Sequence, residues 1–470
     1  MWKQYRKYIV LIISFMIGLA MWLSPAPEGM QEKGWHLLAI FISTIVAIIM
    51  QAMPMGAIAI VAIAVALITK TLTLQEALSG FSNHIIWLVV LAFFISRGII
   101  STGLGTRAAY IFMRMLGKST LGLSYGMIAT DLLLAPAIPS VTARAGGIVY
   151  PILSGLSKAF GSEAGLGTSR RIASFLTQVA FQGSCVTSAM FLTSMAGNPV
   201  IKSIAAEAGV VITWGSWAVA SIVPGLLSLI LIPLIIYKIY PPEIKETPQA
   251  KALAHQKLKE MGPMKRDEWI MLSVFILLVG LWAGESFFKI APTTAAMFGL
   301  AILLITGVLN WKDILKEEGA WDTMVWLGTL LMLATYLFNF GVTGVMSQKI
   351  MGHVVGLNWV TAFGVLSLVY YFSHYFFASN MAHISALYSP FLVLMIAMGT
   401  PPVLAALTLA FFSNLFGSLT HYGCGPAPIF FGTGNVTIGD WWKLGFIISV
   451  VNIIIWLVVG SMWWKLVGFW

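Results

Sequence analysis

The chain carries the stretch PSVTARAGGIVYP at residues 139–151 and an altered copy of it, ASNMAHISALYSP, at residues 378–390. The copies keep a constant register, because Ser140 and Ser379 are 239 residues apart and so are Pro151 and Pro390. In each copy, small hydroxyl or amide residues precede an alanine and a basic residue, in a chain that otherwise keeps charge out of its apolar runs. A repeat that retains polar residues at such places indicates a binding site.

The composition around this repeat is that of a membrane protein. Hydrophobic residues make up 59% of the 470 residues and charged residues 9%, and the mean hydropathy is +0.90. A soluble core of this length could not bury so much apolar surface. Several apolar runs, beginning with residues 8–23, approach the roughly 20 residues that a membrane-spanning helix needs. We therefore expect an all-α polytopic membrane protein with about eleven transmembrane helices.

The basic residues report membrane topology. The net charge of +10 does not indicate a nucleic-acid partner, because Lys and Arg follow the loops instead of gathering on one face. Lys3, Arg6 and Lys7 share a side with the lysine-rich segment 240–266 if the spans alternate, and cytoplasmic loops are the ones enriched in Lys and Arg. We expect a bacterial inner-membrane protein surrounded by lipid, with a cytoplasmic N-terminus and an external C-terminus, and without a nucleic-acid partner.

The flanks of the quoted stretch predict how it enters the membrane. The apolar segments 121–138 and 148–156 are each short for crossing a bilayer. A tip of Pro, Ser, Thr and Gly between them predicts a re-entrant helical hairpin over about 120–157, whose backbone lines an enclosed cavity. The polar segment 172–195 follows, and then Gly197-Asn198-Pro199, which predicts a helix with an unwound middle.

The same order of elements occurs twice. We expect an N-terminal anchor helix in residues 1–34, a first repeat in 35–239, a cytoplasmic linker in 240–266, and a second repeat in 267–470 with a hairpin at about 359–398. Each repeat has an odd number of full spans, so the two copies must have opposite orientations. The re-entrant hairpins of two inverted repeats would then meet near the midplane of the membrane.

The repeated tips suit an anionic ligand. A helix N-terminus at each tip presents backbone N–H groups and a positive dipole end, and two facing tips could hold a molecule with a carboxylate at each end. Ser140, Thr142, Ser379 and Asn380 are the side-chain donors. Arg144 and His383 add basic groups to the two tips. A guanidinium near the bilayer centre costs roughly 2.5–3.5 kcal/mol, so it requires a partner. The alternatives are that Arg144 bonds to helix carbonyls and that His383 is an ordinary core histidine.

At these residues the sequence resembles the divalent anion:sodium symporter (DASS) family, whose members carry a Ser-Asn-Thr motif at each of two hairpin tips. Here Val141 stands in place of the first Asn and Met381 in place of the second Thr. The resemblance implies a homodimer with a scaffold domain and a transport domain that moves as an elevator, unwound segments at 188–199 and 418–428, and di- or tricarboxylate substrates. The substrate-binding residues that it implies are Ser140, Val141, Thr142, Ser379, Asn380, Met381, Ser188, Asn198 and Thr420.

The basic tip residues make the sequence more similar to the exchanger branch of that family. Sodium-coupled members place Na⁺ beside each tip, whereas Arg144 and His383 would act here as fixed counter-ions. Without an anion the positive charge would be uncompensated, and moving it through the low-dielectric barrier is costly. We therefore predict Na⁺-independent exchange of dicarboxylates such as succinate, malate, fumarate or 2-oxoglutarate, with no metal and no cofactor. The alternative is Na⁺-coupled di- or tricarboxylate symport, with Na⁺ as the coupling ion.

Other classes of protein fit the sequence less well. An intramembrane enzyme could use His383 or His421, but the sequence has no HExxH motif and no nucleophile with a base at a recognisable spacing. A channel is a further alternative, although hairpins that meet head to head suit an occluded site better than an open pore. We expect a transporter and not an enzyme.

Overall fold

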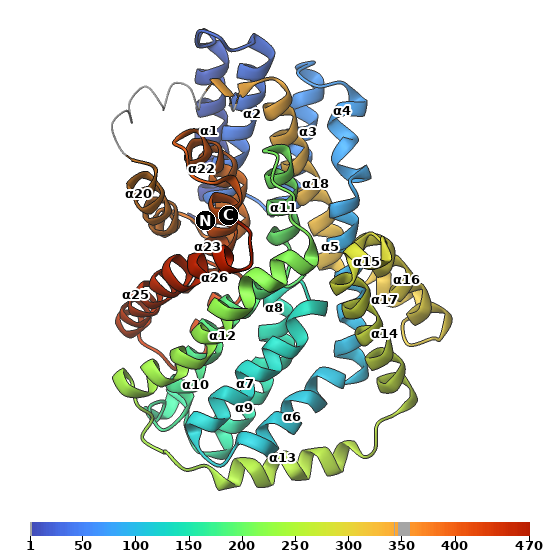
Figure 1. The fold of residues 1–470 in the computed structure, drawn as a ribbon, viewed down its shortest axis with the longest axis vertical. Helices are drawn as coiled ribbons and strands as arrows, with labels where there is room; N and C mark the ends of the chain where they lie inside the picture. Colours follow the sequence, from blue (N-terminus) through green and yellow to red (C-terminus); the bar gives the residue numbers. More distant parts are fainter. Residues whose placement is uncertain (1, 343, 346–357) are drawn as a thin grey trace. The chain divides into compact units, whose positions relative to one another are not determined.

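The computed structural model describes residues 2–342, 344–345 and 358–470, and within these ranges it contains helices and no strand (Figure 1). Among the described residues, six helices are long and apolar enough to cross a membrane, and four shorter apolar helices accompany them. The long segments are Glu32–Ile49, His84–Thr102, Trp214–Ile239, Glu318–Asn339, Asn380–Ala397 and Ile438–Leu466. Lengths of 18 residues or more match the thickness of the hydrocarbon core. The chain is an all-helical, multi-pass membrane protein.

The chain forms two compact units. Unit 1 comprises Met1–Val90, Pro199–Val211 and Glu318–Leu409, and unit 2 comprises Leu91–Asn198, Ile212–Glu317 and Ala410–Trp470. Helices α5 (His84–Thr102), α11 (Gly197–Glu207) and α23 (Pro402–Leu415) each cross a boundary between these segments.

Unit 1 contains two groups of helices. The first is α1 (Trp2–Leu23), α2 (Glu32–Ile49), α3 (Met55–Ile68), α4 (Leu74–Leu78), η1 (Ser79–Ser82) and α18 (Glu318–Asn339). The second is α20 (Trp359–Phe372), η5 (Ser373–Phe376), α21 (Asn380–His383), η6 (Ile384–Tyr388) and α22 (Ser389–Ala397). Glycine allows one close contact in the first group, because a Cβ on Gly80 would clash with the backbone carbonyl of Gly328 in α18. The second group contains the repeated stretch 378–390.

Unit 2 contains the first copy of the stretch. It begins with α6 (Leu104–Leu116), α7 (Thr120–Leu134), η2 (Ala135–Ala137), α8 (Val141–Arg144), η3 (Ala145–Val149), α9 (Tyr150–Ala159), η4 (Ala164–Leu166) and α10 (Ala173–Met190). It continues with α12 (Trp214–Ile239), α13 (Pro248–Met261), α14 (Arg266–Ala283), α15 (Glu285–Phe288), α16 (Pro292–Ile305) and α17 (Trp311–Leu315). Its last part is η7 (Phe416–Ser418), α24 (Ala427–Phe431), α25 (Ile438–Ile454), η8 (Ile455–Gly460) and α26 (Ser461–Leu466).

The two copies of the stretch fold into the same succession of elements. Helix α20 begins 239 residues after α7, and the same offset separates α8 from α21 and α9 from α22. The offset also holds for η3 and η6, which are both single π-helical turns, an element that occurs often at functional sites. Ser119 caps α7 and its counterpart Asn358 caps α20 through the same hydrogen bond to the third residue of the helix.

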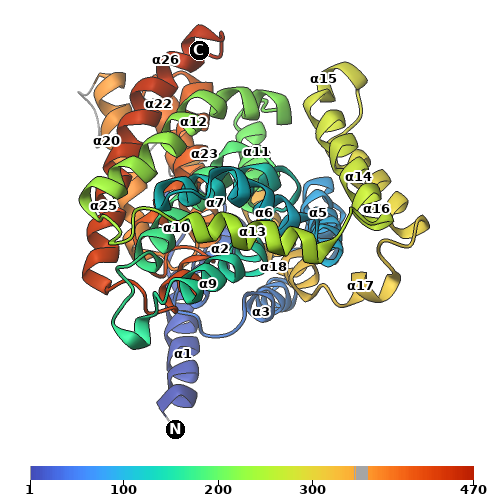
Figure 2. The ribbon, with the colours of Figure 1, turned by 90° about the horizontal axis from the view of Figure 1, so that it is seen from below.

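The segment between the two long halves of the sequence is packed onto unit 2. Helix α13 lies beside α6 (Figure 2), and the backbone before it pairs with the start of α7. Thr120 N–H donates to the Lys245 carbonyl at 2.9 Å, and Thr247 N–H donates to the Lys118 carbonyl at 2.8 Å. The linker is therefore fixed at its N-terminal end against the base of the first tip's helix.

Candidate functional site

The first tip begins at Ser140, whose side chain accepts a hydrogen bond from the N–H of Ala143 at 3.1 Å. This capping bond lets α8 start directly after Ser140, because it satisfies one of the N–H groups that a helix start leaves open. Val141, Thr142 and Arg144 therefore lie in the first helical turn.

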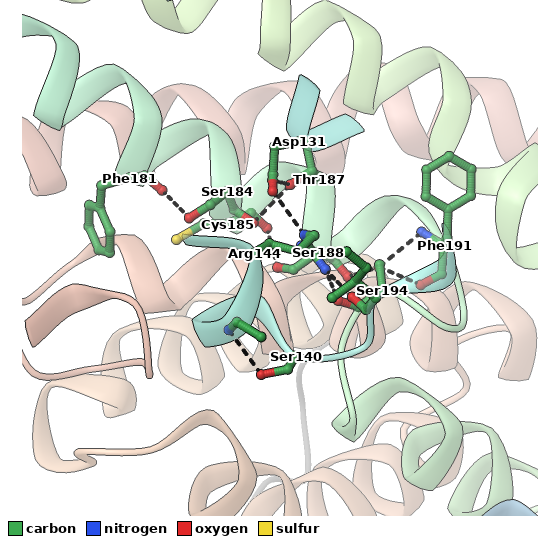
Figure 3. A network of polar contacts seen from close by, with 12 residues as sticks. Asp131, Ser140, Arg144, Phe181, Ser184, Cys185, Thr187, Ser188, Phe191 and Ser194 are labelled. Carbon is green, nitrogen blue, oxygen red and sulfur yellow. Dashed lines mark hydrogen bonds and ion pairs between the residues drawn. The ribbon is translucent and has the colours of Figure 1, made fainter. Parts of the chain in front are cut away.

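Arg144 is fully buried and joins three segments of unit 2 (Figure 3). Its Nε donates to Asp131 Oδ1 in α7 at 2.9 Å. Its Nη1 donates to the carbonyl of Ile138 in the tip and to the carbonyl of Ser194 at 2.7 Å. Its Nη2 has no hydrogen-bond partner among the residues that the structure describes. The guanidinium thus links the tip to the segment after α10 and keeps one donor group for a further acceptor.

Asp131 is the residue that the sequence analysis missed. It is 4% exposed, and its second carboxylate oxygen accepts a hydrogen bond from the Thr187 hydroxyl in α10. The repeat offers a signal that could have found it, because the position 239 residues after Asp131 is Tyr370, and the Tyr370 ring lies 4.6 Å from the His383 ring. In both copies the residue thirteen positions before the basic residue contacts it.

The ion pair corrects one step of the sequence-based argument. That argument treated Arg144 as a positive charge without compensation in the empty protein. Asp131 balances it at 2.9 Å, so the pair carries no net charge when both groups are ionised. Arg144 also donates to two backbone carbonyls, those of Ile138 and Ser194, and both lie outside the helices, unlike the helix carbonyls of the alternative.

The segment after α10 is irregular and is held by Asn198. Helix α10 ends at Met190, and the Asn198 side-chain nitrogen donates to the carbonyls of Ser188 at 2.8 Å and Phe191 at 2.9 Å. These bonds satisfy carbonyls that the end of the helix leaves open. The Ser188 hydroxyl itself donates to the Cys185 carbonyl of its own helix at 2.8 Å, so in this structure Ser188 contributes its backbone to the site.

A second irregular segment, residues 419–426, follows η7 in the same unit. The Asn414 side-chain nitrogen, in α23 before η7, donates to Asn198 Oδ1 at the start of α11 at 2.8 Å. The Thr420 hydroxyl is buried and has no partner in the described part of the chain. Gly425 approaches the first tip so closely that a Cβ there would clash with Thr142 Oγ1. Unit 2 therefore gathers the tip, both irregular segments and seven of the expected residues: Ser140, Val141, Thr142, Arg144, Ser188, Asn198 and Thr420.

The other four expected residues belong to unit 1. Ser379 is extended and precedes α21, which contains Asn380, Met381 and the buried His383. The His383 ring lies 4.7 Å from the Phe377 ring and 5.3 Å from the His374 ring.

Ser373 of η5 forms a hydrogen bond with the His383 ring. Ser373 Oγ donates to the Tyr370 carbonyl at 2.8 Å and lies 2.8 Å from His383 Nε2. Among the described residues, no group of three or more His, Cys, Asp or Glu side chains could hold a metal ion.

The fold is shared with solved membrane transporters. The chain superposes on the Neisseria gonorrhoeae efflux pump MtrF with a TM-score of 0.57 at 14% identity, over 96% of this chain and 97% of that one. It superposes on the Alcanivorax borkumensis YdaH transporter with a TM-score of 0.55 at 13% identity, over 84% and 88% of the two chains. The protein thus has the fold of an all-helical membrane transporter, as the sequence predicted.

Sequence comparison identifies the family. Residues 5–470 match the family model described as the sodium:sulfate symporter transmembrane region, and the chain belongs to this family of divalent anion:sodium symporters. It is 56% identical to the putative malate transporter YflS of Bacillus subtilis, over 99% of this chain and 97% of the relative. It is 49% identical to the chloroplastic dicarboxylate transporter 1 of Spinacia oleracea, over 98% and 81%. The Escherichia coli inner membrane protein YbhI is 34% identical over 99% and 98%. The family resemblance drawn from the tips is confirmed.

Proposed function

We propose that this protein is a secondary active transporter that exchanges dicarboxylates across the membrane without Na⁺. Two relatives that align over nearly the whole of this chain are named for malate and for dicarboxylate transport. The first tip adds a helix start, hydroxyl groups and the available Nη2 of Arg144, which together suit a carboxylate. Succinate, malate, fumarate and 2-oxoglutarate each carry two carboxylates, and the first tip would hold one of them.

The observation that carries Na⁺ independence is the position of the Arg144 Nη1 atom. It bonds to the carbonyls of Ile138 and Ser194, which belong to the tip and to the irregular segment after α10. A bound Na⁺ in this place would coordinate backbone carbonyls of the same kind. The guanidinium supplies that bridge permanently, so the tip needs no cation to hold it against the segment. We assign His383 the corresponding role at the second tip.

The requirement for exchange would arise from the cost of buried donors without partners in the empty carrier, more than from a net charge on it. Asp131 already balances Arg144, yet Arg144 Nη2 and the Thr420 hydroxyl remain buried without a partner in the described structure. A buried donor left unsatisfied costs about 1–3 kcal/mol, and more when it is charged. A substrate carboxylate that accepts from Arg144 Nη2 would remove the cost of that donor during the transition through the membrane. The loaded carrier would therefore move faster than the empty one.

The proposal includes the architecture expected of this function. We propose eleven spans and two re-entrant hairpins in two inverted repeats, with a cytoplasmic N-terminus and an external C-terminus in the bacterial inner membrane. A homodimer would hold a scaffold domain in place while a transport domain moves as an elevator. The equal element order around α8 and α21, at one offset, supports the repeat.

Na⁺-coupled symport is the second candidate. It is favoured by the same Arg144–Asp131 pair, because a site without net fixed charge leaves room for a cation to balance the substrate. The two candidates differ in what drives accumulation. Symport requires an external Na⁺ gradient, and exchange requires a dicarboxylate on the far side.

The deciding experiment measures radiolabelled malate or succinate uptake into proteoliposomes, with external Na⁺ and internal unlabelled dicarboxylate varied independently. The proposal predicts uptake that requires internal dicarboxylate and is unchanged when choline replaces Na⁺. Uptake driven by Na⁺ into vesicles without internal anion would establish the symporter instead. Absence of uptake under every condition, with dicarboxylates shown not to bind, would exclude both candidates.

A further inference from the structure

Helix α10 presents a buried polar face to α25 within unit 2. Ser174, Thr177, Gln178 and Gln182 recur at spacings of three and four residues, so they share one face of the helix. Each of the four is at most 1% exposed. Phe181 lies on the same face, and its ring packs 4.6 Å from the ring of Trp441 in α25. This face is therefore turned inward, where water from the bulk does not reach it.

Most of the polar atoms on this face have no hydrogen-bond partner among the described residues. Within the described residues, no hydrogen bond forms to the hydroxyls of Ser174 and Thr177, to either polar atom of the Gln178 carboxamide, or to Gln182 Oε1. Serine and threonine inside a helix normally donate to a carbonyl of the preceding turn. Ser184 does so in α10, with a bond of 2.7 Å to the Phe181 carbonyl. The face over Ser174–Gln182 therefore departs from the pattern of its own helix.

Helix α25 contributes unsatisfied donors to the same region. Among the residues whose burial the structure describes, five tryptophans are fully buried. Four of them donate their indole N–H to a protein acceptor: Trp217, Trp282, Trp456 and Trp464. Trp441 is the fifth, and its Nε1 has no acceptor in the part of the chain that the structure describes. Asn452, three turns further along the helix, has neither of its carboxamide atoms bonded to described residues.

Two hydrogen bonds connect the polar face of α10 to α25 through η7. Gln182 Nε2 donates to the Ser418 carbonyl in η7 at 3.3 Å, and the Ser418 hydroxyl lies 3.0 Å from the Ser449 hydroxyl in α25. Ser449 is one helical turn before Asn452. We call these buried polar groups of α10, η7 and α25 the polar seam; it comprises Ser174, Thr177, Gln178, Gln182, Ser418, Trp441, Ser449 and Asn452.

We propose that the polar seam binds a row of water molecules. The unsatisfied atoms include donors, such as Gln178 Nε2 and Trp441 Nε1, and acceptors, such as Gln182 Oε1. A metal cation would satisfy the oxygens alone, and an anion the N–H and O–H groups alone. Water donates and accepts, and buried water molecules typically bond to two to four such groups. The bound water supplies exchangeable hydrogen-bond partners beside Ser418, where the chain leaves its helix. This inference concerns a second site and does not depend on the substrate.

The direct test is hydroxyl-radical labelling by X-ray radiolysis of the purified, unaltered protein, read by mass spectrometry. Bound water produces radicals in place, so a buried ring beside it becomes oxidised. The expected result is oxidation of Trp441 at least several-fold above that of Trp217, Trp282, Trp456 and Trp464, which are equally buried but bonded to protein. Labelling of Trp441 at the level of these four internal controls would overturn the proposal.

A substitution gives a second test, because it should change the Tm in opposite directions in a hydrated seam and in a dry seam. In a hydrated seam, Gln178→Leu displaces water and leaves neighbouring groups without partners, so the Tm falls and the labelling of Trp441 decreases. In a dry seam, the same change removes an unsatisfied carboxamide and the Tm rises, which would overturn the proposal. Leu176→Met, an apolar change of similar volume in the same helix, controls for repacking. If Gln178→Leu does not fold, the labelling of the unaltered protein decides the question.

Discussion

Asp131 and Arg144 form a buried ion pair between α7 and the first tip, with Asp131 Oδ1 2.9 Å from Arg144 Nε. Their counterparts 239 residues later, Tyr370 and His383, are also in contact, with ring centroids 4.6 Å apart. The repeat thus preserves a relationship between two positions while it replaces a charged pair by an aromatic one. The two tips are consequently unequal in their electrostatics, although they share backbone geometry.

The ion pair makes a prediction that separates folding from transport. Asp131→Asn leaves a buried guanidinium without its carboxylate, and removing one partner of a buried pair costs about 3–5 kcal/mol of stability. Replacing both, as in Asp131→Leu with Arg144→Met, should recover most of the Tm because no charge remains buried. Malate uptake should remain absent in the double variant if Arg144 contacts the substrate. Recovery of uptake together with Tm would show that the pair has a purely structural role.

The contact between the first tip and the second irregular segment is testable through glycine. Gly425→Ala would place a Cβ against Thr142 Oγ1, so the tip or the segment must move. We expect the KM for dicarboxylate uptake to increase at least several-fold, with little change in the amount of folded protein. Gly165→Ala is the matched control, because no heavy atom lies within 4 Å of a Cβ built there.

A compensating change distinguishes crowding from the loss of a hydroxyl. Thr142→Ala removes the clashing oxygen, so the double variant with Gly425→Ala regains room for the tip. Its KM should match that of Thr142→Ala alone if the clash caused the defect. A double variant as impaired as the sum of both single changes would instead locate the effect elsewhere in the segment.

The tips could be predicted because two of their features are visible in the sequence alone. Ser140 and Ser379 recur in register, and Arg144 and His383 are basic residues in apolar surroundings, where an unpaired charge is costly. Asp131 escaped notice because it lies outside the quoted stretch and becomes meaningful only when α7 folds back beside the tip. The π-helical turns η3 and η6 were also beyond prediction, since no side-chain pattern distinguishes them from the α-helix around them.

The roles of the amide residues could be predicted only in outline. Asn198 was expected near the site, but its three hydrogen bonds depend on where α10 ends and on the approach of Asn414 from a segment 216 residues away. Ser188 illustrates the opposite outcome. Its hydroxyl bonds within its own helix, as is common for buried serines, and its carbonyl is the group that the irregular segment uses.

The amide hydrogen bond between α23 and α11 gives a further prediction. Asn414→Leu removes the group that donates a hydrogen bond to Asn198 Oδ1. Asn198 is fully buried, so its carboxamide oxygen would then lack this donor. An unsatisfied buried polar atom costs about 1–3 kcal/mol, so we expect a lower Tm and slower uptake. Asn414→Gln offers a similar donor on a longer side chain and should recover part of both. The hypothesis fails if Asn414→Leu leaves the uptake rate and the Tm unchanged.

A second buried ion pair in unit 2 provides the comparison that the Arg144 result needs. Arg107 in α6 bonds to both carboxylate oxygens of Glu268 in α14, at 2.6 and 3.0 Å, and also to the carbonyl of Gly262 at 2.9 Å. These bonds attach the C-terminal end of the linker, and they lie outside the candidate site. Glu268→Gln should lower stability by about 3–5 kcal/mol, as for any buried pair that loses one charge. The folded Glu268→Gln protein should nevertheless transport with an unchanged KM, whereas Arg144→Ala should abolish transport. Thermal unfolding and uptake measured on the same preparations check both statements. If Glu268→Gln impaired transport as much as Arg144→Ala, the Arg144 phenotype would reflect the loss of a buried ion pair alone.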